Sequence, residues 1–212
     1  ERGRGDVELS HVHFGYRPDK LIIHNFSSVI HAGQTMAIVG RTSAGKTTGV
    51  KLLMRFYELN SGSIFIDGHN ILDFTRNGLR SMFGMVLQET WLYSASIMDN
   101  IRYGNFDKTD EEVMDAARTA HCEAFLRSMP GGYHMMIKEE ASNLSQGQKQ
   151  LLTIARTILA DPQIRILDEA TSSIDTRTEV LIQNAMNNLM QDRTSFVIAH
   201  RLSTIRDADL IL

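Results

Sequence analysis

The chain is poor in cysteine and proline and has no long apolar run. Of its 212 residues, one is Cys and three are Pro. The single cysteine, Cys122, excludes an internal disulfide framework, and we expect a small buried thiol there. The longest apolar stretches, such as residues 36–39 and 196–199, are only strand-sized, whereas a bilayer-spanning helix needs roughly 18 apolar residues. The sequence shows no secretory signal pattern, so we expect this segment itself to be soluble.

A surplus of positive charge is also absent. Lys and Arg number 22 against 25 Asp and Glu, which gives a formal net charge of −3. Domains that bind nucleic acid usually carry a basic patch or stripe, so no nucleic acid is expected as a partner. The remaining composition, 42% hydrophobic and 22% charged, is ordinary for a globular protein with one sizeable core.

Both ends of the chain predict a domain taken from a longer protein. The sequence begins with ERGRG rather than with Met, and this segment resembles a linker. It stops inside a strand-like run at residues 208–212. We therefore expect further protein on both sides.

Period-two alternation and turn residues predict an antiparallel β portion near the N-terminus. Residues 7–16, 21–30 and 63–67 alternate apolar and polar side chains, as half-exposed strands do. Turn signals lie at Asn60-Ser61-Gly62 and at Asp67-Gly68.

Short apolar runs followed by helical patterns predict a parallel sheet. Residues 35–39 form such a run before the helical pattern of residues 46–57. The order returns with runs at 164–167 and 195–199, separated by a helical pattern at 178–190. Repeated strand–helix units of this kind are typical of a parallel sheet that is buried on both faces.

A helical insertion is predicted between the two halves of that pattern. Residues 110–128 have helical periodicity, and Thr109 with Glu112 three residues later forms a capping-box sequence. The predicted fold class is α/β, a P-loop NTPase core with a mostly parallel sheet, an N-terminal antiparallel β-subdomain and an inserted α-helical subdomain. Residues 1–212 would form one domain. Within it, residues 1–88 and 146–212 would form the β-subdomain and P-loop core, and residues 89–145 the helical subdomain.

A glycine-containing loop between the run at 35–39 and the following helix satisfies the pattern G-x-x-x-x-G-K-[ST]. Its residues are Gly40, Arg41, Thr42, Ser43, Ala44, Gly45, Lys46 and Thr47. Phosphates require close backbone approach, several N–H donors and the positive end of a helix, and this loop supplies all three. Lys46 would reach the β- and γ-phosphates, and the Thr47 hydroxyl would bind Mg²⁺. The alternative is a chance match of a short pattern. A chance match would not be expected to lie between a strand and a helix, as this loop does.

Two adjacent carboxylates end the run at residues 164–167. Asp168 and Glu169 would lie at the carboxyl edge of the sheet, where open α/β sheets bind ligands. Asp168 can hold Mg²⁺, and Glu169 can orient and deprotonate an attacking water. The alternative is that both carboxylates are solvated at an acidic strand end and have no catalytic role. The presence of a phosphate loop in the same chain disfavours that alternative.

Arg165 conflicts with a strand buried on both faces, because an unpaired buried charge costs several kcal/mol. The side chain would have an acid or carbonyl partner, extend to an edge of the sheet, or weaken the domain. The sequence leaves these three outcomes open.

With these residues in place, the chain resembles the nucleotide-binding domain of ABC transporters over essentially its whole length. The discriminating element is LSQGQ at residues 144–148, which is similar to the LSGGQ signature of that family. Tyr16 resembles the aromatic residue that stacks on adenine, and Gln88 resembles the Q-loop glutamine. SSID at residues 172–175 is similar to the D-loop, and His200 to the switch histidine.

The resemblance implies ATP and Mg²⁺ as cofactors and a head-to-tail pair of nucleotide-binding domains, homodimeric or heterodimeric. In each pair, Ser145, Gly147 and Gln148 of one domain would close over ATP that is held by the P-loop residues and Thr48 of the other. Gln88 would contact Mg²⁺, the γ-phosphate and the membrane domains of the transporter. His200 would hold the γ-phosphate and the attacking water. The expected location is the cytoplasmic face of the cell membrane.

The phrases MRFYELNSGSIFIDG, SIMDNIRYG and MPGGYHMMIKEEASNLSQGQ are similar to those of multidrug and lipid exporters. Residues 139–143 would contact the coupling helices of the membrane domains. The chain departs from the family pattern at four positions: Ser43 and Gln146 replace Gly, and Gly49 and Arg165 replace aliphatic residues.

Three functional hypotheses follow. The first is an ATPase domain that dimerises on MgATP and powers export, with Lys46, Gln88, Glu169 and His200 as catalytic residues. The second is a non-transport ABC ATPase acting on DNA or ribosomes, which predicts basic patches or long coiled-coil insertions that the sequence does not contain. The third is a nucleotide-binding regulatory module with weak turnover, which the substitutions Ser43 and Arg165 suggest.

Overall fold

The computed structural model describes residues 3–17, 19–40, 43–138, 141–169 and 173–212. The chain divides into two compact units. The sheet unit contains Glu1–Phe83, Gln163–Glu169 and Asp192–Leu212, and the helix unit contains Gly84–Pro162 and Ala170–Gln191. Each unit is therefore assembled from segments that are distant in sequence.

An antiparallel sheet forms the first part of the sheet unit, with the strand order β2-β1-β4-β5. Its strands are β1 (Val7–Phe14), β2 (Ile23–Ile30), β4 (Ser61–Ile66) and β5 (His69–Asn70). The predicted turn at Asp67 and Gly68 joins β4 to β5, and both residues have left-handed backbone, with φ of 49° and 79°. The antiparallel portion that the alternating pattern predicts is confirmed.

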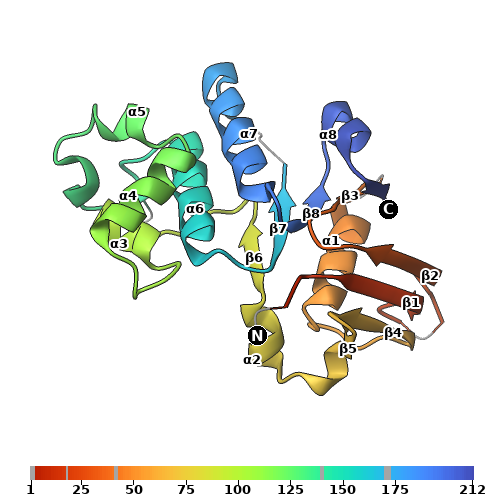
Figure 1. Ribbon diagram of the computed structural model, residues 1–212. Coiled ribbons are helices and arrows are strands. Elements are labelled where there is room, and N and C mark those ends of the chain that lie inside the picture. Colours follow the sequence, from red (N-terminus) through yellow and green to blue (C-terminus); the bar gives the residue numbers. More distant parts are fainter. Residues whose placement is uncertain (1–2, 18, 41–42, 139–140, 170–172) are drawn as a thin grey trace. The chain divides into compact units, whose positions relative to one another are not determined.

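A parallel sheet forms the second part, and three of its strands, β3, β7 and β8, are labelled in Figure 1. They lie in the order β7-β8-β3-β9. The bounds are β3 (Thr35–Ile38), β7 (Ile164–Asp168), β8 (Thr194–Ile198) and β9 (Leu210–Ile211). β8 is buried throughout and β7 at its first four residues, which agrees with the apolar residues that both strands carry on both faces. A further strand, β6 (Phe83–Val86), lies at the boundary between the units.

The helices of the sheet unit are α1 (Ser43–Leu53), η1 (Ile71–Asp73), α2 (Arg76–Ser81) and α8 (Leu202–Asp207). α1 follows β3 and α8 follows β8. Both helices therefore begin beyond the carboxyl ends of parallel strands, the edge at which such sheets bind ligands.

The helix unit is built around α6. Its elements are α3 (Ile97–Arg102), α4 (Asp110–Thr119), α5 (Glu123–Leu126), η2 (Gly132–His134), α6 (Gln146–Ala160) and α7 (Thr176–Met190). α6 packs against α3, α4 and α7, and it lies between α4 and α7 in Figure 1. Leu151, Leu152 and Ile154 of α6 are almost fully buried, so the apolar face of this helix is the core of the unit.

The helical pattern at residues 110–128 forms two helices rather than one. The capping box is confirmed: the Thr109 hydroxyl accepts the Glu112 N–H, and the Glu112 carboxylate accepts the Thr109 N–H. α4 ends at Thr119, and His121 has left-handed backbone with φ of 58°. A non-glycine residue in that conformation breaks helical continuity, so α5 starts on a new axis at Glu123.

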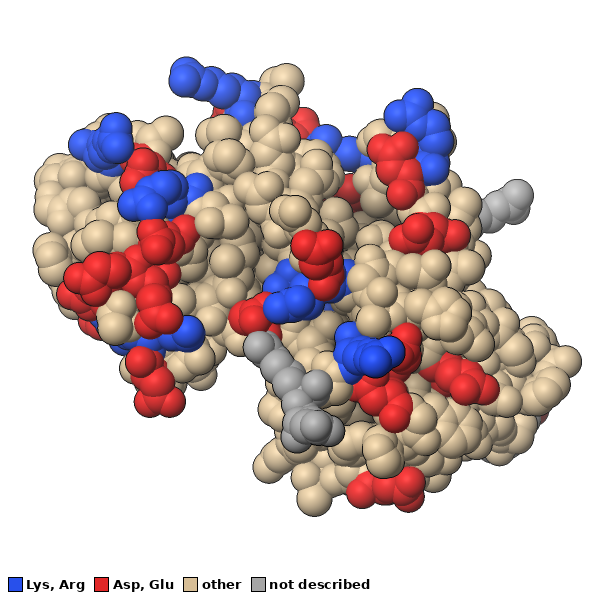
Figure 2. Space-filling model, in the orientation of Figure 1, with Lys and Arg blue, Asp and Glu red and all other residues tan. Residues whose placement is uncertain are grey.

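α6 and α7 belong to the helix unit. The grouping of residues 146–212 with the P-loop core stays a prediction. Among the described residues, the structure has no helix long and apolar enough to cross a membrane. On the face drawn in Figure 2, basic and acidic side chains lie interspersed.

Candidate functional site

The predicted phosphate loop joins β3 to α1 in the sheet unit. β3 ends at Ile38, and α1 begins at Ser43, so that Ala44, Gly45, Lys46 and Thr47 lie in its first turns. Arg41 and Thr42 lie outside the described residues. A Cβ at Gly40 would lie 3.5 Å from Cγ of Lys46, so glycine leaves the space beside the lysine stem open. The first N–H groups of a helix have no partner within the helix, and this end attracts anions.

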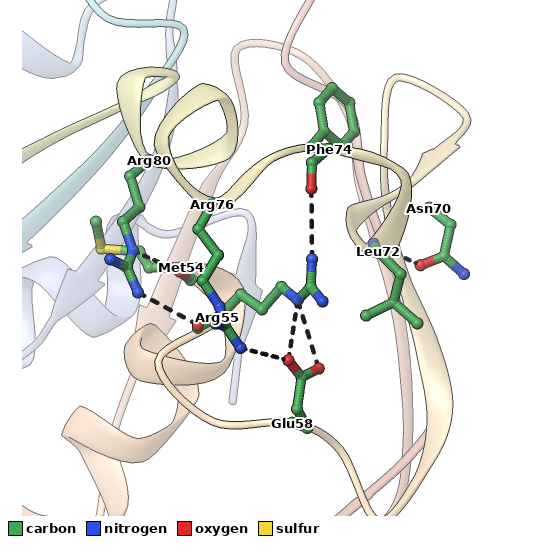
Figure 3. Close-up of polar contacts among 8 residues, drawn as sticks. All are labelled: Met54, Arg55, Glu58, Asn70, Leu72, Phe74, Arg76 and Arg80. Carbon is green, nitrogen blue, oxygen red and sulfur yellow. Dashed lines mark hydrogen bonds and ion pairs between the residues drawn. The ribbon is translucent and has the colours of Figure 1, made fainter.

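The opposite end of α1 is held by arginine side chains, which can be followed in Figure 3. Arg80 of α2 donates from Nε to the carbonyl oxygen of Met54 at 3.2 Å and from a terminal nitrogen to that of Arg55 at 3.4 Å. The carbonyl oxygens at the end of a helix need such donors. The guanidinium of Arg80 also lies 4.2 Å from the centre of the Phe56 ring.

A second set of contacts extends this anchor. Arg55 pairs with Glu58 at 3.1 Å and donates to the carbonyl oxygen of Phe74 at 3.4 Å. Arg76 also pairs with Glu58, at 3.0 Å. Figure 3 shows both arginines directed toward the same carboxylate. Sequence reasoning did not identify these residues, although they fix the helix that carries Lys46.

Tyr16 is positioned by contacts to α1 and to two aromatic rings. Its hydroxyl shares a hydrogen bond of 2.8 Å with the hydroxyl of Thr48, which is fully buried. Phe14 and Tyr57 pack edge-on against it, each with a centroid distance of 5.1 Å. Tyr16 nevertheless remains 46% exposed. The ring is held in orientation and still offers surface for a flat ligand.

The two predicted acids stand at the carboxyl edge of the parallel sheet. Asp168 ends β7, opposite Ile198 of β8, and the N–H of Glu169 donates to the Ile198 carbonyl oxygen at 3.2 Å. His200 follows β8 by two residues. Its Nε2 lies 3.2 Å from Oδ1 of Asp168. The structure thus brings Asp168 and His200 together, although they are 32 residues apart in sequence.

Glu169 is the more enclosed of the two acids, with 3% of its surface exposed. One carboxylate oxygen, Oε2, accepts the backbone N–H of His200 at 3.2 Å. The other, Oε1, accepts the hydroxyl of Thr204 in α8. A buried polar group needs hydrogen-bond partners, and these two groups supply one donor to each carboxylate oxygen.

The structure excludes one of the three outcomes left open for Arg165, namely an extension of its side chain to an exposed edge of the sheet. The residue is 5% exposed, so it does not extend to the solvent at an edge. It faces Ser195 in the register of β7 and β8. It has an interaction partner, so its charge is not left isolated inside the sheet.

The signature residues begin α6 in the helix unit. Ser145 is the N-cap: its hydroxyl accepts the Gln148 N–H at 3.2 Å, and the Gln148 side chain accepts the Ser145 N–H at 2.9 Å. This reciprocal capping box leaves the Ser145 O–H available as a donor. Gly147 is buried against α7, because a Cβ there would lie 2.3 Å from Cγ2 of Thr178. Gln146 is exposed, and the family's Gly is therefore replaced without steric cost.

Gln88 lines a cavity of about 580 Å³ that lies within the helix unit. The other lining residues are Glu89, Thr90, Gln146, Lys149, Gln150, Ser173 and Ile174. The predicted D-loop thus contributes Ser173 and Ile174, while Ser172 lies outside the described residues. Asp175, its last residue, caps α7 by accepting the Thr178 N–H at 2.9 Å. This bond holds the pKa of Asp175 below its usual value.

An aromatic surface that sequence reasoning missed follows Gln88 in the chain. Trp91 is 59% exposed. It stacks on Tyr93 at a centroid distance of 5.7 Å, and Tyr103 contacts both rings. Phe106 continues the row at 5.6 Å from Tyr103. The spacing of these aromatics, at 91, 93, 103 and 106, was the only signal available in the sequence.

Arg156 of α6 supports the aromatic surface. Its guanidinium lies 5.8 Å from the centre of Trp91 and 5.2 Å from that of Tyr103. It donates to the carbonyl oxygens of Asn100 at 2.8 Å and Trp91 at 3.0 Å. Burial lowers the pKa of Arg156, but an arginine remains charged at neutral pH. Exposed contiguous aromatics of this kind mark interaction surfaces.

Comparison with known proteins places these features in a family. The chain matches the ABC transporter family over residues 23–172. It is 57% identical over 208 residues to a fatty acid ABC transporter ATP-binding/permease protein of Mycobacterium bovis, covering 98% of this chain and 33% of that protein. It is 46% identical over 211 residues to ABC transporter B family member 2 of Dictyostelium discoideum, covering 99% and 15%.

A solved structure agrees with these relatives. A bacterial Atm1-family ABC exporter with ATP bound matches the whole of this chain and 37% of its own, with a TM-score of 0.87 and 42% identity. The chain therefore spans about a third of the length of the Mycobacterium relative and of this exporter. The phosphate loop, the acid pair and the signature helix lie on a fold shared with that exporter, and the chain belongs to the ABC transporter family as a nucleotide-binding domain of the exporter type.

Proposed function

We propose that this domain hydrolyses ATP to power export across a membrane, and that its own reacting groups all belong to the sheet unit. The observation that carries this proposal is the meeting of Asp168, Glu169 and His200 at the carboxyl edge of the parallel sheet. β3 of the same sheet leads into α1 with Lys46.

Each group has a distinct role in phosphoryl transfer to water. Lys46 neutralises charge on the β- and γ-phosphates. Glu169 accepts a proton from the attacking water. Its carboxylate follows Asp168 directly at the carboxyl end of β7, and Asp168 is assigned to Mg²⁺. His200 holds the γ-phosphate and the water. Its Nε2 lies beside Asp168 in this structure, so the ring exchanges a carboxylate partner for a phosphate partner when nucleotide binds.

The residues present fit a magnesium ion bridged to nucleotide phosphates. Asp168 and the Thr47 hydroxyl are hard oxygen donors of the type that Mg²⁺ prefers, and few protein ligands suffice because phosphates and water fill the remaining positions. When bound, the ion neutralises developing charge on the phosphates.

The signature acts on a second nucleotide. Ser145 lies at the N-terminus of α6, which spans 15 residues and has no acidic residue in its first turn. This helix end attracts an anion. Because the sheet unit already carries one phosphate loop, we assign the signature to ATP bound by a second nucleotide-binding domain, in a head-to-tail dimer.

The membrane domains would contact the aromatic surface formed by Trp91, Tyr93, Tyr103 and Phe106. Its exposed rings, backed by Arg156, offer apolar area directly after Gln88. The Mycobacterium relative joins ATP-binding and permease functions in one protein. The domain would then work at the cytoplasmic face of the cell membrane, and a fatty acid or similar lipid is the first substrate class to test.

Substitution of the proposed base tests the function. Full-length protein carrying Glu169→Gln should lose about 10² to 10⁴ of its ATPase turnover, the usual contribution of a general base. It should still bind ATP and accumulate as an ATP-bound dimer in gel filtration. Glu179→Gln, on α7, provides a matched control. Equal and near-zero turnover of wild type and variant would instead favour a regulatory module with weak turnover.

A further inference from the structure

Two donors from one short segment hold the carboxylate of Glu169. The backbone N–H of His200 and the hydroxyl of Thr204 each donate to a different carboxylate oxygen. Both belong to the stretch that leaves β8 and forms the first turn of α8. Two donors on separate oxygens fix the plane of a carboxylate, whereas one donor leaves it able to rotate about its last torsion angle.

Thr204 is suited to this task by its position. It is the third residue of α8 and partly buried, while Ser203 beside it is exposed. Threonine is β-branched, so its hydroxyl has few rotamers within a helix. Glu169 is 3% exposed, and water therefore cannot easily replace a missing donor. The hydroxyl at position 204 thus has no ready substitute.

From these contacts we propose that Thr204 is a positioning residue for hydrolysis. It orients the Glu169 carboxylate toward the water that attacks the γ-phosphate, and it couples that carboxylate to the segment that carries His200. The inference rests on the proposed role of Glu169 as the base. In this proposal Thr204 acts only through Glu169 and is assigned no contact of its own with nucleotide or water.

The test compares four full-length proteins by their steady-state ATPase rates. Thr204→Val keeps the shape of the side chain and removes the hydroxyl, and it should lower kcat about tenfold, the effect expected for a lost hydrogen bond to a charged group. The KM for ATP should stay within about twofold, because binding groups are untouched. Thr204→Ser should restore kcat to near the wild-type value, and Ser203→Ala should leave it unchanged.

A double substitution separates positioning from general loss of structure. If Thr204 acts through Glu169, then adding Thr204→Val to Glu169→Gln should change the residual rate by less than about twofold. If the melting temperature shows that the Thr204→Val variant does not fold, the Thr204→Ala variant is used instead.

Three results would overturn the proposal. They are an unchanged kcat in Thr204→Val, a kcat in Thr204→Ser as low as in Thr204→Val, and a further tenfold loss in the Glu169→Gln background. A failure of the underlying function looks different, since Glu169→Gln alone would then retain wild-type turnover.

Discussion

The sheet unit and the helix unit use their polar residues in opposite ways. In the sheet unit, Asp168 and Glu169 are engaged by His200 and Thr204, which come from a distant part of the chain. In the helix unit, the signature residues Ser145 and Gln148 bond mainly to each other. The acid pair therefore finds its polar partners within its own unit. The signature residues cap their own helix, which agrees with our proposal that they bind ATP held by a second domain.

The difference also shows in the glycines of the two phosphate-directed helices. A Cβ at Gly147 in α6 would lie 2.3 Å from a Thr178 carbon, while a Cβ at Gly49 in α1 would meet no atom within 4 Å. The helix unit needs glycine for packing. In the sheet unit, packing does not require glycine at position 49.

The largest effect on stability should come from replacing each of these glycines by alanine. Gly147→Ala should lower the free energy of unfolding by about 1–3 kcal/mol, as overpacking does. The matched variant Gly49→Ala should raise it by about 1 kcal/mol, because alanine is the better helix former. Denaturant unfolding measures both. Adding Thr178→Ala should recover much of the loss at 147, and equal effects of the two alanine variants would erase the distinction between the helices.

The next effect concerns the anchor of α1. Arg80→Leu removes the donors to the Met54 and Arg55 carbonyl oxygens, and it should cost about 1–2 kcal/mol of stability. Arg206→Leu is the control, because Arg206 is exposed and bonds only its neighbour Asp207. A melting temperature equally lowered in both variants would show that the anchor has no special role.

A smaller effect is expected in the helix unit at its capping box. Thr109→Ala should destabilise α4 by about 1 kcal/mol, whereas Thr119→Ala, at the other end of the same helix, removes no cap. Hydrogen exchange of α4 amides reports the local effect. Unchanged exchange rates in Thr109→Ala would mean that packing against α6, rather than the cap, holds this helix.

The smallest effect is a pH dependence at Asp175. The bond from the Thr178 N–H lowers its pKa from the usual 3.8. A lowered folded-state pKa contributes stability above pH 3.8 that disappears as the pH falls through the folded value. Wild type should therefore lose slightly more stability than Asp175→Asn on acidification below about pH 4. If the free energy of unfolding of the two proteins falls identically below about pH 4, the protonation of this carboxylate is not linked to folding.

Short-range patterns revealed most of the sheet unit. The strand before Gly40 and the run before Asp168 could be located because buried parallel strands are continuously apolar. Family resemblance singled out His200, but its contact with Asp168 was not predicted and appears only in the structure. Thr204 escaped notice because nothing local marks a hydroxyl that bonds a residue 35 positions away.

In the helix unit, sequence reasoning was weaker at boundaries. The break at His121 depends on a left-handed residue that is not glycine, and no propensity indicates that. The aromatic surface at Trp91 could not be found from local sequence, because Arg156, which supports it, lies 65 residues away in the chain. The capping box at Thr109 was found, since its signal lies within four residues.

The most direct measurement is the ATPase rate of a purified dimer that combines one full-length Lys46→Ala chain with one full-length Ser145→Arg chain. If the signature serves the partner's nucleotide, this dimer has one intact site, and it should show about half the wild-type rate if the sites are independent. The reciprocal dimer, one wild-type chain with one doubly substituted chain, should be inactive because both of its sites are damaged. An inactive first dimer and an active second one would contradict the proposal, because each signature would then serve its own chain.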